Sequence, residues 1–260
     1  MNIFQAVKNE TNIVDVYQDL TGNSVSGINK NVNCPSPGHI DKTPSCKLYP
    51  DTNSFNCFGL GCNAGGSVID MVQQVQGTSP LEAAQWLADR YSIQYEDLTP
   101  EAKEQIQKRQ TRKEIMTSFI EKSHKRLTAE HRNLLHTRGL SDETIDTYKI
   151  GYCPRFTRDQ VKDLKNNNPE KYQDHKLIGL INDNDSFIPG DRIIIPFWRY
   201  NEPIYWVSWD NNQSDYKYLN PAGMEKPVIF HIANNDNAVY ITEGVFDFYS
   251  LVEAGKNVIA

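Results

Sequence analysis

The first third of the chain carries short stretches of apolar residues at helical spacing, interrupted by shorter strand-like stretches. Ile13, Val16 and Tyr17 recur every three to four residues, which predicts one buried helix face, and Gly22 follows as a stop signal. Proline, glycine, aspartate and asparagine separate the segments that follow. The pattern predicts a helix, three short strands and two further helices, at residues 13–20, 30–34, 46–49, 54–58, 67–75 and 79–91.

The second half of the chain changes from helical patterns to strand patterns. Its predicted elements are helices near 130–138 and 141–148, strands at 192–198, 204–209, 216–219 and 239–242, a helix at 245–252 and a last strand at 258–260. A strand, a glycine turn, a helix and a strand in this order are typical of the start of a parallel α/β layer. We expect that sheet to continue beyond Ala260, so that the sequence would break off inside it.

Three blocks follow from this organisation: residues 1–97, a polar and helix-prone linker at 98–127, and the remainder. The net charge is −6, yet residues 102–138 hold ten Lys and Arg against four acidic residues. Such a block is compatible with salt-sensitive contacts to a polyanion, and equally with a solvated helix face. Apolar runs reach only strand length and no signal peptide is visible, so we expect a cytoplasmic protein without membrane contact.

Four of the five cysteines cluster in one short segment, which in a reducing compartment indicates metal binding before disulfides. Cys34 and His39 form one pair with four residues between them, and Cys57 and Cys62 form a second pair with the same spacing. Three thiolates and one imidazole complete a tetrahedral zinc shell with no open position, so the predicted ion is structural. Cys46 is a rival ligand, although its place among strand residues favours packing.

The residues around these four ligands form a recognisable set. They are Cys34-Pro35, His39, Asp41 to Ser45, Asn56-Cys57-Phe58, Cys62, Gly65-Gly66 and Asp70. This set resembles the zinc-binding domain of bacterial and phage DNA primases of the DnaG type. In that family the two residues of each ligand pair are usually separated by two residues, whereas both pairs here have four between them. The resemblance implies that the domain helps to recognise a single-stranded template.

Further segments follow the order found in the RNA-polymerase domain of the same family. They are Arg138-Gly139-Leu140-Ser141, Ile150-Gly151-Tyr152, Arg192 to Phe197, Lys217 to Pro221 and Thr242 to Asp247. Together with the zinc segment they extend the resemblance from about residue 10 to the end of the chain. The resemblance implies that residues 128–237 form the first subdomain of the polymerase core and that 238–260 begin a TOPRIM domain.

By the same resemblance, Glu243 and Asp247 would belong to an acidic catalytic site. Glu243 would serve as a metal ligand or general acid/base, and Asp247 would add a carboxylate one helical turn later. Joining nucleotides calls for Mg²⁺ or Mn²⁺. Complementing the helix dipole is the alternative role of Asp247. The Asp-x-Asp pair that completes a TOPRIM site is expected beyond Ala260, so we expect this chain alone to lack the full metal site.

The resemblance also implies contacts to the phosphates of template or nucleotide. Lys217 and Asn220 match a Lys-Tyr-Leu-Asn motif that makes such contacts in the family. Arg138, Arg192 and Lys226 are weaker candidates for the same groove, with surface ion pairing as the alternative.

The sequence therefore predicts an α+β multidomain protein, in which a small zinc-ribbon-like domain with helices precedes a mixed α/β primase core ending in a partial TOPRIM parallel sheet. The expected function is that of a DNA primase, a nucleotidyltransferase that makes short RNA primers on single-stranded DNA for replication. Expected partners are the template, nucleoside triphosphates and a replicative helicase, and expected cofactors are one structural Zn²⁺ and catalytic Mg²⁺ or Mn²⁺. The alternative is a non-catalytic zinc-dependent module that binds single-stranded DNA or a replication partner.

Overall fold

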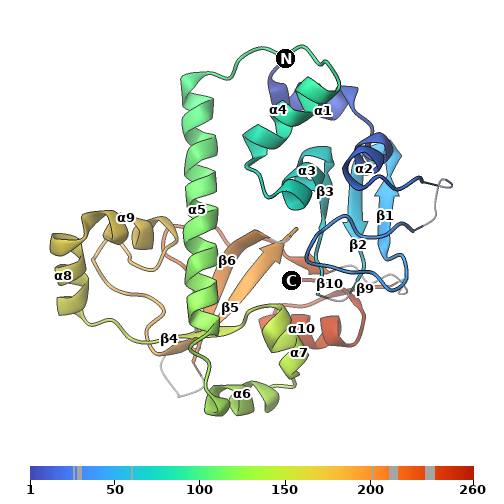
Figure 1. Cartoon of the computed structure of the whole chain (residues 1–260). Coiled ribbons are helices and arrows are strands. Elements are labelled where there is room, and N and C mark those ends of the chain that lie inside the picture. The colour runs from blue at the N-terminus through green and yellow to red at the C-terminus, as the bar shows by residue number, and fades with distance from the viewer. Residues whose placement is uncertain (26, 28–30, 60, 201, 211–215, 232–237) are drawn as a thin grey trace. The chain divides into compact units, whose positions relative to one another are not determined.

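A computed structural model describes the chain except for residues 26, 28–30, 60, 201, 211–215 and 232–237 (Figure 1). The chain divides into two compact units, Met1–Gln110 and Thr111–Ala260. Helix α5 (Pro100–His124) begins in the first unit and continues into the second. Each unit encloses its own buried apolar residues, so each is described by itself.

The first unit packs helices on one small sheet. Before α5 its elements are α1 (Ile3–Glu10), α2 (Ile13–Thr21), β1 (Cys46–Tyr49), a 3-10 turn (Pro50–Thr52), β2 (Ser54–Cys57), β3 (Gly65–Ser67), α3 (Val68–Gln76) and α4 (Pro80–Arg90). The predicted helices near 13–20, 67–75 and 79–91 and the strands near 46–49 and 54–58 are confirmed. The strand predicted at 30–34 begins in residues outside the described part, and Val32 forms only an isolated bridge to Cys46.

The sheet of the first unit is antiparallel, in the order β1–β2–β3. Cys46 lies opposite Cys57 across the β1–β2 pair, and Asn53 closes the turn between them with a left-handed φ of 49°. Asparagine tolerates this conformation better than most residues. Phe55 and Cys57 alternate toward the core along β2, so one face of the sheet is buried. The hairpin therefore fixes the position of Cys57, one of the predicted zinc ligands.

Capping residues determine where the helices of this unit begin. Ser79 and Glu82 form the capping box expected from the sequence, with the Ser79 amide donating to the Glu82 carboxylate at 2.8 Å. A second capping box, between Ser67 and Asp70, begins α3. Because Ser67 is also the last residue of β3, the chain passes from the sheet into α3 without a loop.

The second unit combines helices with two sheets. Its elements after α5 are α6 (Ala129–His136), α7 (Asp142–Thr147), β4 (Gly151–Cys153), α8 (Arg158–Asn167), α9 (Pro169–Leu177), β5 (Arg192–Arg199), β6 (Glu202–Trp209), β7 (Tyr218–Leu219), β8 (Phe230–His231), β9 (Val239–Ile241), α10 (Val245–Glu253) and β10 (Asn257–Ile259). Strands β4 to β7 form an antiparallel sheet in that order. Strand β5 is buried on both faces: Ile193 and Ile195 pack into one apolar cluster and Ile194 into another.

The other sheet of the second unit has the order β8–β10–β9. Strands β9 and β10 run parallel and are joined through α10, as the sequence predicts, while β8 pairs antiparallel with β10. Figure 1 shows α10 between these two strands along the chain, in the red part of the colour scale. The predicted α+β class and the parallel strand pair are thus confirmed.

Two long-range contacts hold α10 in place. The Glu253 carboxylate accepts hydrogen bonds from the backbone amide and the hydroxyl of Ser141, both at 2.7 Å. The buried Tyr249 hydroxyl donates to the Pro196 carbonyl on β5 at 2.7 Å. The helix is therefore fastened both to the beginning of α7 and to the central sheet.

Helices α8 and α9 lie in a stretch for which the apolar pattern made no prediction. They are mostly polar, and each buries a single side chain, Val161 in α8 and Tyr172 in α9. Helix α5 is long but also polar, and within the described residues no helix is long and apolar enough to cross a bilayer.

Candidate functional site

Four metal-ligand side chains converge at one end of the β1–β2 hairpin. Cys34, His39, Cys57 and Cys62 each offer a ligand atom, and these atoms all lie within 4.8 Å of one another. Cys57 is the last residue of β2, and the other three stand on the loops on either side of the hairpin. Tight turns shape these loops, because the His39 amide donates to the Ser36 carbonyl and the Cys62 amide to the Gly59 carbonyl.

The distances within this cluster fit a tetrahedral zinc ion. Cys34 Sγ lies 3.5 Å from Cys62 Sγ, and Cys57 Sγ lies 3.3 Å from His39 Nδ1. Zinc–sulfur bonds of about 2.3 Å at tetrahedral angles place two sulfurs roughly 3.8 Å apart. The donor set and its spacing therefore suit zinc, with Nδ1 as the histidine ligand atom.

The electrostatics of the cluster favour a bound cation. A hydrogen bond from Cys34, together with one from Cys62, lowers the pKa of Cys57, whereas the pKa of Cys34 is raised mainly by its contact with Cys57. One thiolate is thus stabilised at the expense of its neighbours, since like charges at this distance repel. Three thiolates can coexist here when a divalent cation lies between them.

Asp41 supports two of the ligands from behind. Its carboxylate side chain is only 3% exposed and lies 3.3 Å from His39 Nε2, the ring nitrogen that faces away from the sulfurs. It also accepts hydrogen bonds from the amide of Cys34 at 2.6 Å and from the hydroxyl of Ser45 at 2.5 Å. A carboxylate behind a ligating histidine orients the ring and raises its basicity. The sequence analysis placed Asp41 in the matching motif without assigning it this role.

Gly59 makes room for the histidine ring. A Cβ atom at this position would overlap the His39 ring and lie 2.7 Å from His39 Nε2. The Gly59 amide also donates to Cys57 Sγ at 3.4 Å, a contact that stabilises a thiolate. Gly59 is therefore required because the His39 ring approaches it closely, and not because of its own φ angle.

Cys46, the rival ligand, lies outside the cluster. Its side chain is fully buried in the core of the first unit, and burial raises the pKa of its thiol. It packs as a small apolar residue, as its place in the strand pattern favoured.

Glu243 and Asp247 lie where strand β9 passes into α10. Both carboxylates are exposed, and Asp247 stands in the first turn of the helix, for which Gly244 is the N-cap. A Cβ atom on Gly244 would collide with the Asp247 carboxylate, which shows that this side chain folds back over the turn. The two acids are thus brought to one end of β9.

Arg138 and Lys217 approach the same region of the second unit. The Arg138 guanidinium lies 4.8 Å from the centre of the Phe246 ring on α10, and Lys217 Nζ lies 5.9 Å from that of Tyr218. Burial raises the pKa of Tyr218. The positive charge of Arg138 lowers the same pKa and the negative charge of Asp247 raises it, so both charged groups lie near Tyr218. These contacts gather cations from the turn after α6 and from the residue that precedes β7 near an acid on α10. Asn220 and Lys226 are also exposed.

Arg192 differs from the other candidate cations because it is buried. Its residue is 8% exposed, and its guanidinium lies 3.7 Å from the Asp210 carboxylate and 3.4 Å from the Lys217 carbonyl. The Asp210 amide donates to the same carbonyl. Arg192 therefore fastens β5 to the segment that carries Lys217.

Comparison with known proteins places this site in context. Residues 1–103 match the CHC2 zinc finger family. The DNA primase of Rickettsia felis is 28% identical over 97% of this chain, and that of Listeria monocytogenes is 26% identical over 99%. The chain spans less than half of these relatives, 44% and 45% of their lengths.

The fold has a counterpart among solved structures. The Aquifex aeolicus primase, in a crystal structure of its zinc-binding and RNA polymerase domains, superposes with a TM-score of 0.55 at 24% identity. The match covers 100% of this chain and 66% of that one. The chain is thus similar to bacterial DNA primases over almost its whole length, and its first 103 residues match the CHC2 zinc finger family.

Proposed function

We propose that this chain serves in a DNA primase, an RNA polymerase that makes short primers on single-stranded DNA for replication. The observation that carries this proposal is the similarity to DNA primases over 97% of the chain, which includes the four-ligand cluster. The expected nucleotidyl transfer joins ribonucleoside triphosphates opposite a template.

In the proposed metal centre, Cys34, His39, Cys57 and Cys62 hold one zinc ion. The ion supplies a structural cross-link, because four protein ligands leave no position for substrate. The chain's own contribution is to preorganise the ligands: Asp41 orients His39 and the Cys34 backbone. The loops beside the hairpin would then be ordered together with the metal.

We propose that Glu243 and Asp247 contribute carboxylates to a Mg²⁺ or Mn²⁺ site. Magnesium is typically bound through one or two carboxylates together with substrate phosphates, and both acids are exposed beside one glycine turn. The ion would neutralise triphosphate charge and activate the attacking hydroxyl. Within the described residues, no third Cys, His, Asp or Glu forms a metal cluster with this pair.

Arg138, Lys217, Asn220 and Lys226 are proposed to contact phosphates of the template or nucleotide. Their side chains are exposed, and such contacts would be salt-dependent. Arg192 is proposed to act indirectly, since its hydrogen bond positions the Lys217 backbone.

The finer organisation is also proposed. Residues 1–97 would be the zinc-binding domain, 98–127 the basic linker, 128–237 the first polymerase subdomain and 238–260 the start of a TOPRIM domain. The partners would be single-stranded DNA, nucleoside triphosphates and a replicative helicase. Free cysteines fit the reducing cytoplasm as the place of action.

A second candidate function is a non-catalytic module that binds single-stranded DNA. The observation that favours it is the exposure of the four phosphate-contacting candidates, because contacts to template phosphates need no catalytic metal. Two measurements separate the candidates, template binding and primer synthesis.

Template binding is tested by fluorescence anisotropy with a labelled single-stranded oligonucleotide. Lys217→Ala should weaken binding roughly two- to five-fold and reduce the slope of affinity against salt by about one. Lys162→Ala, at an exposed position on α8, is the matched control and should leave both unchanged. Equal binding of Lys217→Ala and wild type across the salt range would reject the role of Lys217.

Primer synthesis is tested with the zinc-loaded chain joined to the remaining segment of the Listeria monocytogenes primase, which would supply the carboxylates expected beyond Ala260, together with a single-stranded template, ribonucleoside triphosphates and either Mg²⁺ or Mn²⁺. Primers that disappear in Glu243→Gln would establish the enzyme. Tight template binding without primers under either metal would favour the binding module.

A further inference from the structure

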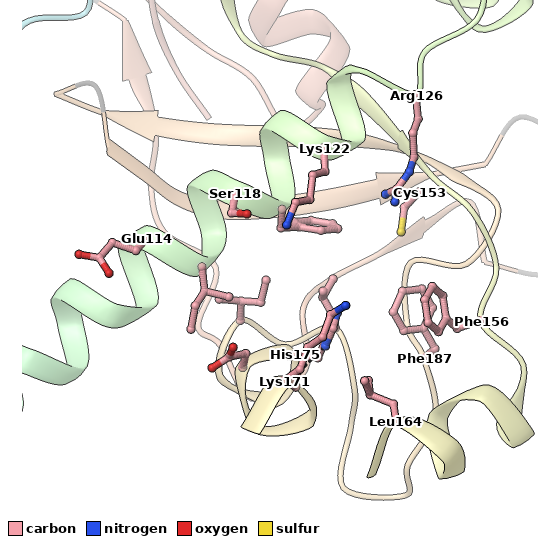
Figure 2. Close-up of a pocket in the computed structure, with 15 residues that line it drawn as sticks. Glu114, Ser118, Lys122, Arg126, Cys153, Phe156, Leu164, Lys171, His175 and Phe187 are labelled. Carbon is pink, nitrogen blue, oxygen red and sulfur yellow. Dashed lines mark hydrogen bonds between the residues drawn. The ribbon is translucent and has the colours of Figure 1, made fainter. Parts of the chain in front are cut away.

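A cavity of about 390 Å³ lies in the second unit, among α5, α8, α9 and the end of β4 (Figure 2). Residues of α5 form one wall, and the segments around Phe156 and Phe187 form the opposite side. The cavity lies next to two separate buried clusters, one that includes Cys153 and another that includes Tyr172. None of its lining residues belongs to the zinc, catalytic or phosphate-contacting candidates.

The walls of this cavity are mainly apolar and partly aromatic. The rings of Phe156 and Phe187 pack in a tilted arrangement, with ring centres 4.9 Å apart and planes inclined by 33°. Leu164 and Ile178 continue the apolar lining, and Cys153 is 3% exposed, with a pKa raised to about 12 by burial. Such walls suit a flat apolar ring more than a polar sugar.

Charge is distributed unevenly around the cavity. Lys122 lies in the last turn of α5 and Arg126 in the turn that follows this helix, and Figure 2 shows Lys122 extending over the cavity and Arg126 beside Cys153. In the described part of the chain, neither cation has a carboxylate partner within 4.0 Å. Glu114 lies at the opposite end of the labelled set.

The α9 side of the cavity adds three polar residues. Lys171 contributes a third cation and Asp174 a second acid. Burial lowers the pKa of His175, although the hydrogen bond between its Nδ1 and the Lys171 carbonyl, at 2.6 Å, acts in the opposite direction. The lining therefore has one more cation than acid, and its Lys122–Arg126 end is cationic.

The size of the cavity indicates the class of occupant. Small-molecule pockets usually measure about 300 to 1,000 Å³ and combine apolar walls with a few convergent polar groups. A partner helix is about 10 Å across with its side chains and needs an open groove. The cavity accordingly suits one compact molecule.

We propose that this cavity binds a small organic anion, with an aromatic ring against Phe156 and Phe187 and a carboxylate facing Lys122 and Arg126. This site is a binding function beyond the proposed primase activity and does not depend on it. The cavity would recognise two features of the anion that can be varied separately, its apolar ring and its single negative charge.

Calorimetric titration of the zinc-loaded chain with 1-naphthoate and with uncharged 1-naphthamide tests both features. Naphthoate should bind about three-fold more tightly, the effect expected of one partly exposed charge pair. Lys122→Met should reduce that preference, because Arg126 alone then faces the carboxylate, while Lys125→Met, a nearby exposed lysine outside the lining, should retain it in full. Equal affinities of the two probes for the wild type, or equal effects of the two variants, would overturn the proposal.

The place of binding is tested through Cys153. Cys153 reacts with iodoacetamide only when the cavity opens, because its thiol is buried and its pKa is raised. Saturating 1-naphthoate binds the closed form and should therefore slow this alkylation at least about three-fold, as resolved by peptide mass spectrometry. Cys46, buried in the other unit, is the internal control and should be unaffected. Ser118→Phe, which fills the cavity from α5, should remove both protection and binding. Unchanged alkylation of Cys153 at saturation would refute the assigned position, and this readout does not require any variant to fold.

Discussion

Replacing Asp41 with asparagine is expected to weaken zinc binding without altering any ligand. The Asp41 carboxylate receives hydrogen bonds from the Cys34 amide and from the Ser45 hydroxyl, and it lies 3.3 Å from His39 Nε2. An asparagine keeps one acceptor oxygen but presents an NH₂ group in place of the other. In either orientation of the amide, the NH₂ group of the asparagine faces an N–H or O–H donor whose hydrogen bond the aspartate accepts.

The magnitude follows from the kind of bond that is lost. Hydrogen bonds to a charged group contribute about 1.5–3 kcal/mol, and the buried site screens them little. A loss of about 2 kcal/mol corresponds to roughly a 30-fold weaker zinc affinity. Residues that orient metal ligands typically change metal affinity by about 10- to 100-fold, which includes this value.

Competition with a chromogenic zinc chelator at neutral pH measures this change directly. Asp51→Asn is the matched control, because Asp51 is exposed on the turn of the same hairpin. Circular dichroism of both zinc-loaded variants checks that the fold is retained. A zinc affinity of Asp41→Asn within two-fold of wild type would show that the carboxylate does not support the site.

Three further changes test other contacts. Gly59→Ala should displace the His39 ring and lower zinc affinity by at least about ten-fold, measured by the same competition. An unchanged zinc affinity would show that a Cβ atom at position 59 does not disturb the His39 ring. Tyr249→Phe should lower the free energy of unfolding by about 1 kcal/mol in urea titrations, because a buried carbonyl loses its donor; an unchanged midpoint would contradict it. Hydrogen bonds from Arg90 and then Tyr91 lower the pKa of Asp19, so its stabilising effect exists above the unfolded pKa and is lost as pH falls through the folded one. Asp19→Asn should therefore reduce the thermal midpoint more at pH 7 than at pH 3, and an equal reduction at both would refute the linkage.

Much of the zinc finger could be predicted because its signals are local. The spacing of Cys34, His39, Cys57 and Cys62 indicated two ligand pairs on either side of a hairpin, and the structure brings these side chains together. The capping box at Ser79 is equally local. In such cases a few neighbouring residues carry the whole signal.

Other features depend on contacts between distant segments. Helices α8 and α9 are polar on most sides, so their apolar periodicity is weak and gave no prediction. The place of Arg192 beside Asp210 depends on the antiparallel pairing of β5, β6 and β7, which brings these distant segments together. The support that Asp41 gives to His39 likewise depends on how the loop folds.

The bond between Glu253 and Ser141 has a consequence for biosynthesis. Its two partners are 112 residues apart, so the start of α7 leaves the ribosome long before α10 exists to dock on it. At about 5–20 residues per second, that delay lasts roughly 5 to 20 s. During this interval the apolar side chains of α6 and α7 that share one buried cluster with α10 lack those partners, so the nascent second unit is open to chaperone capture or to cleavage.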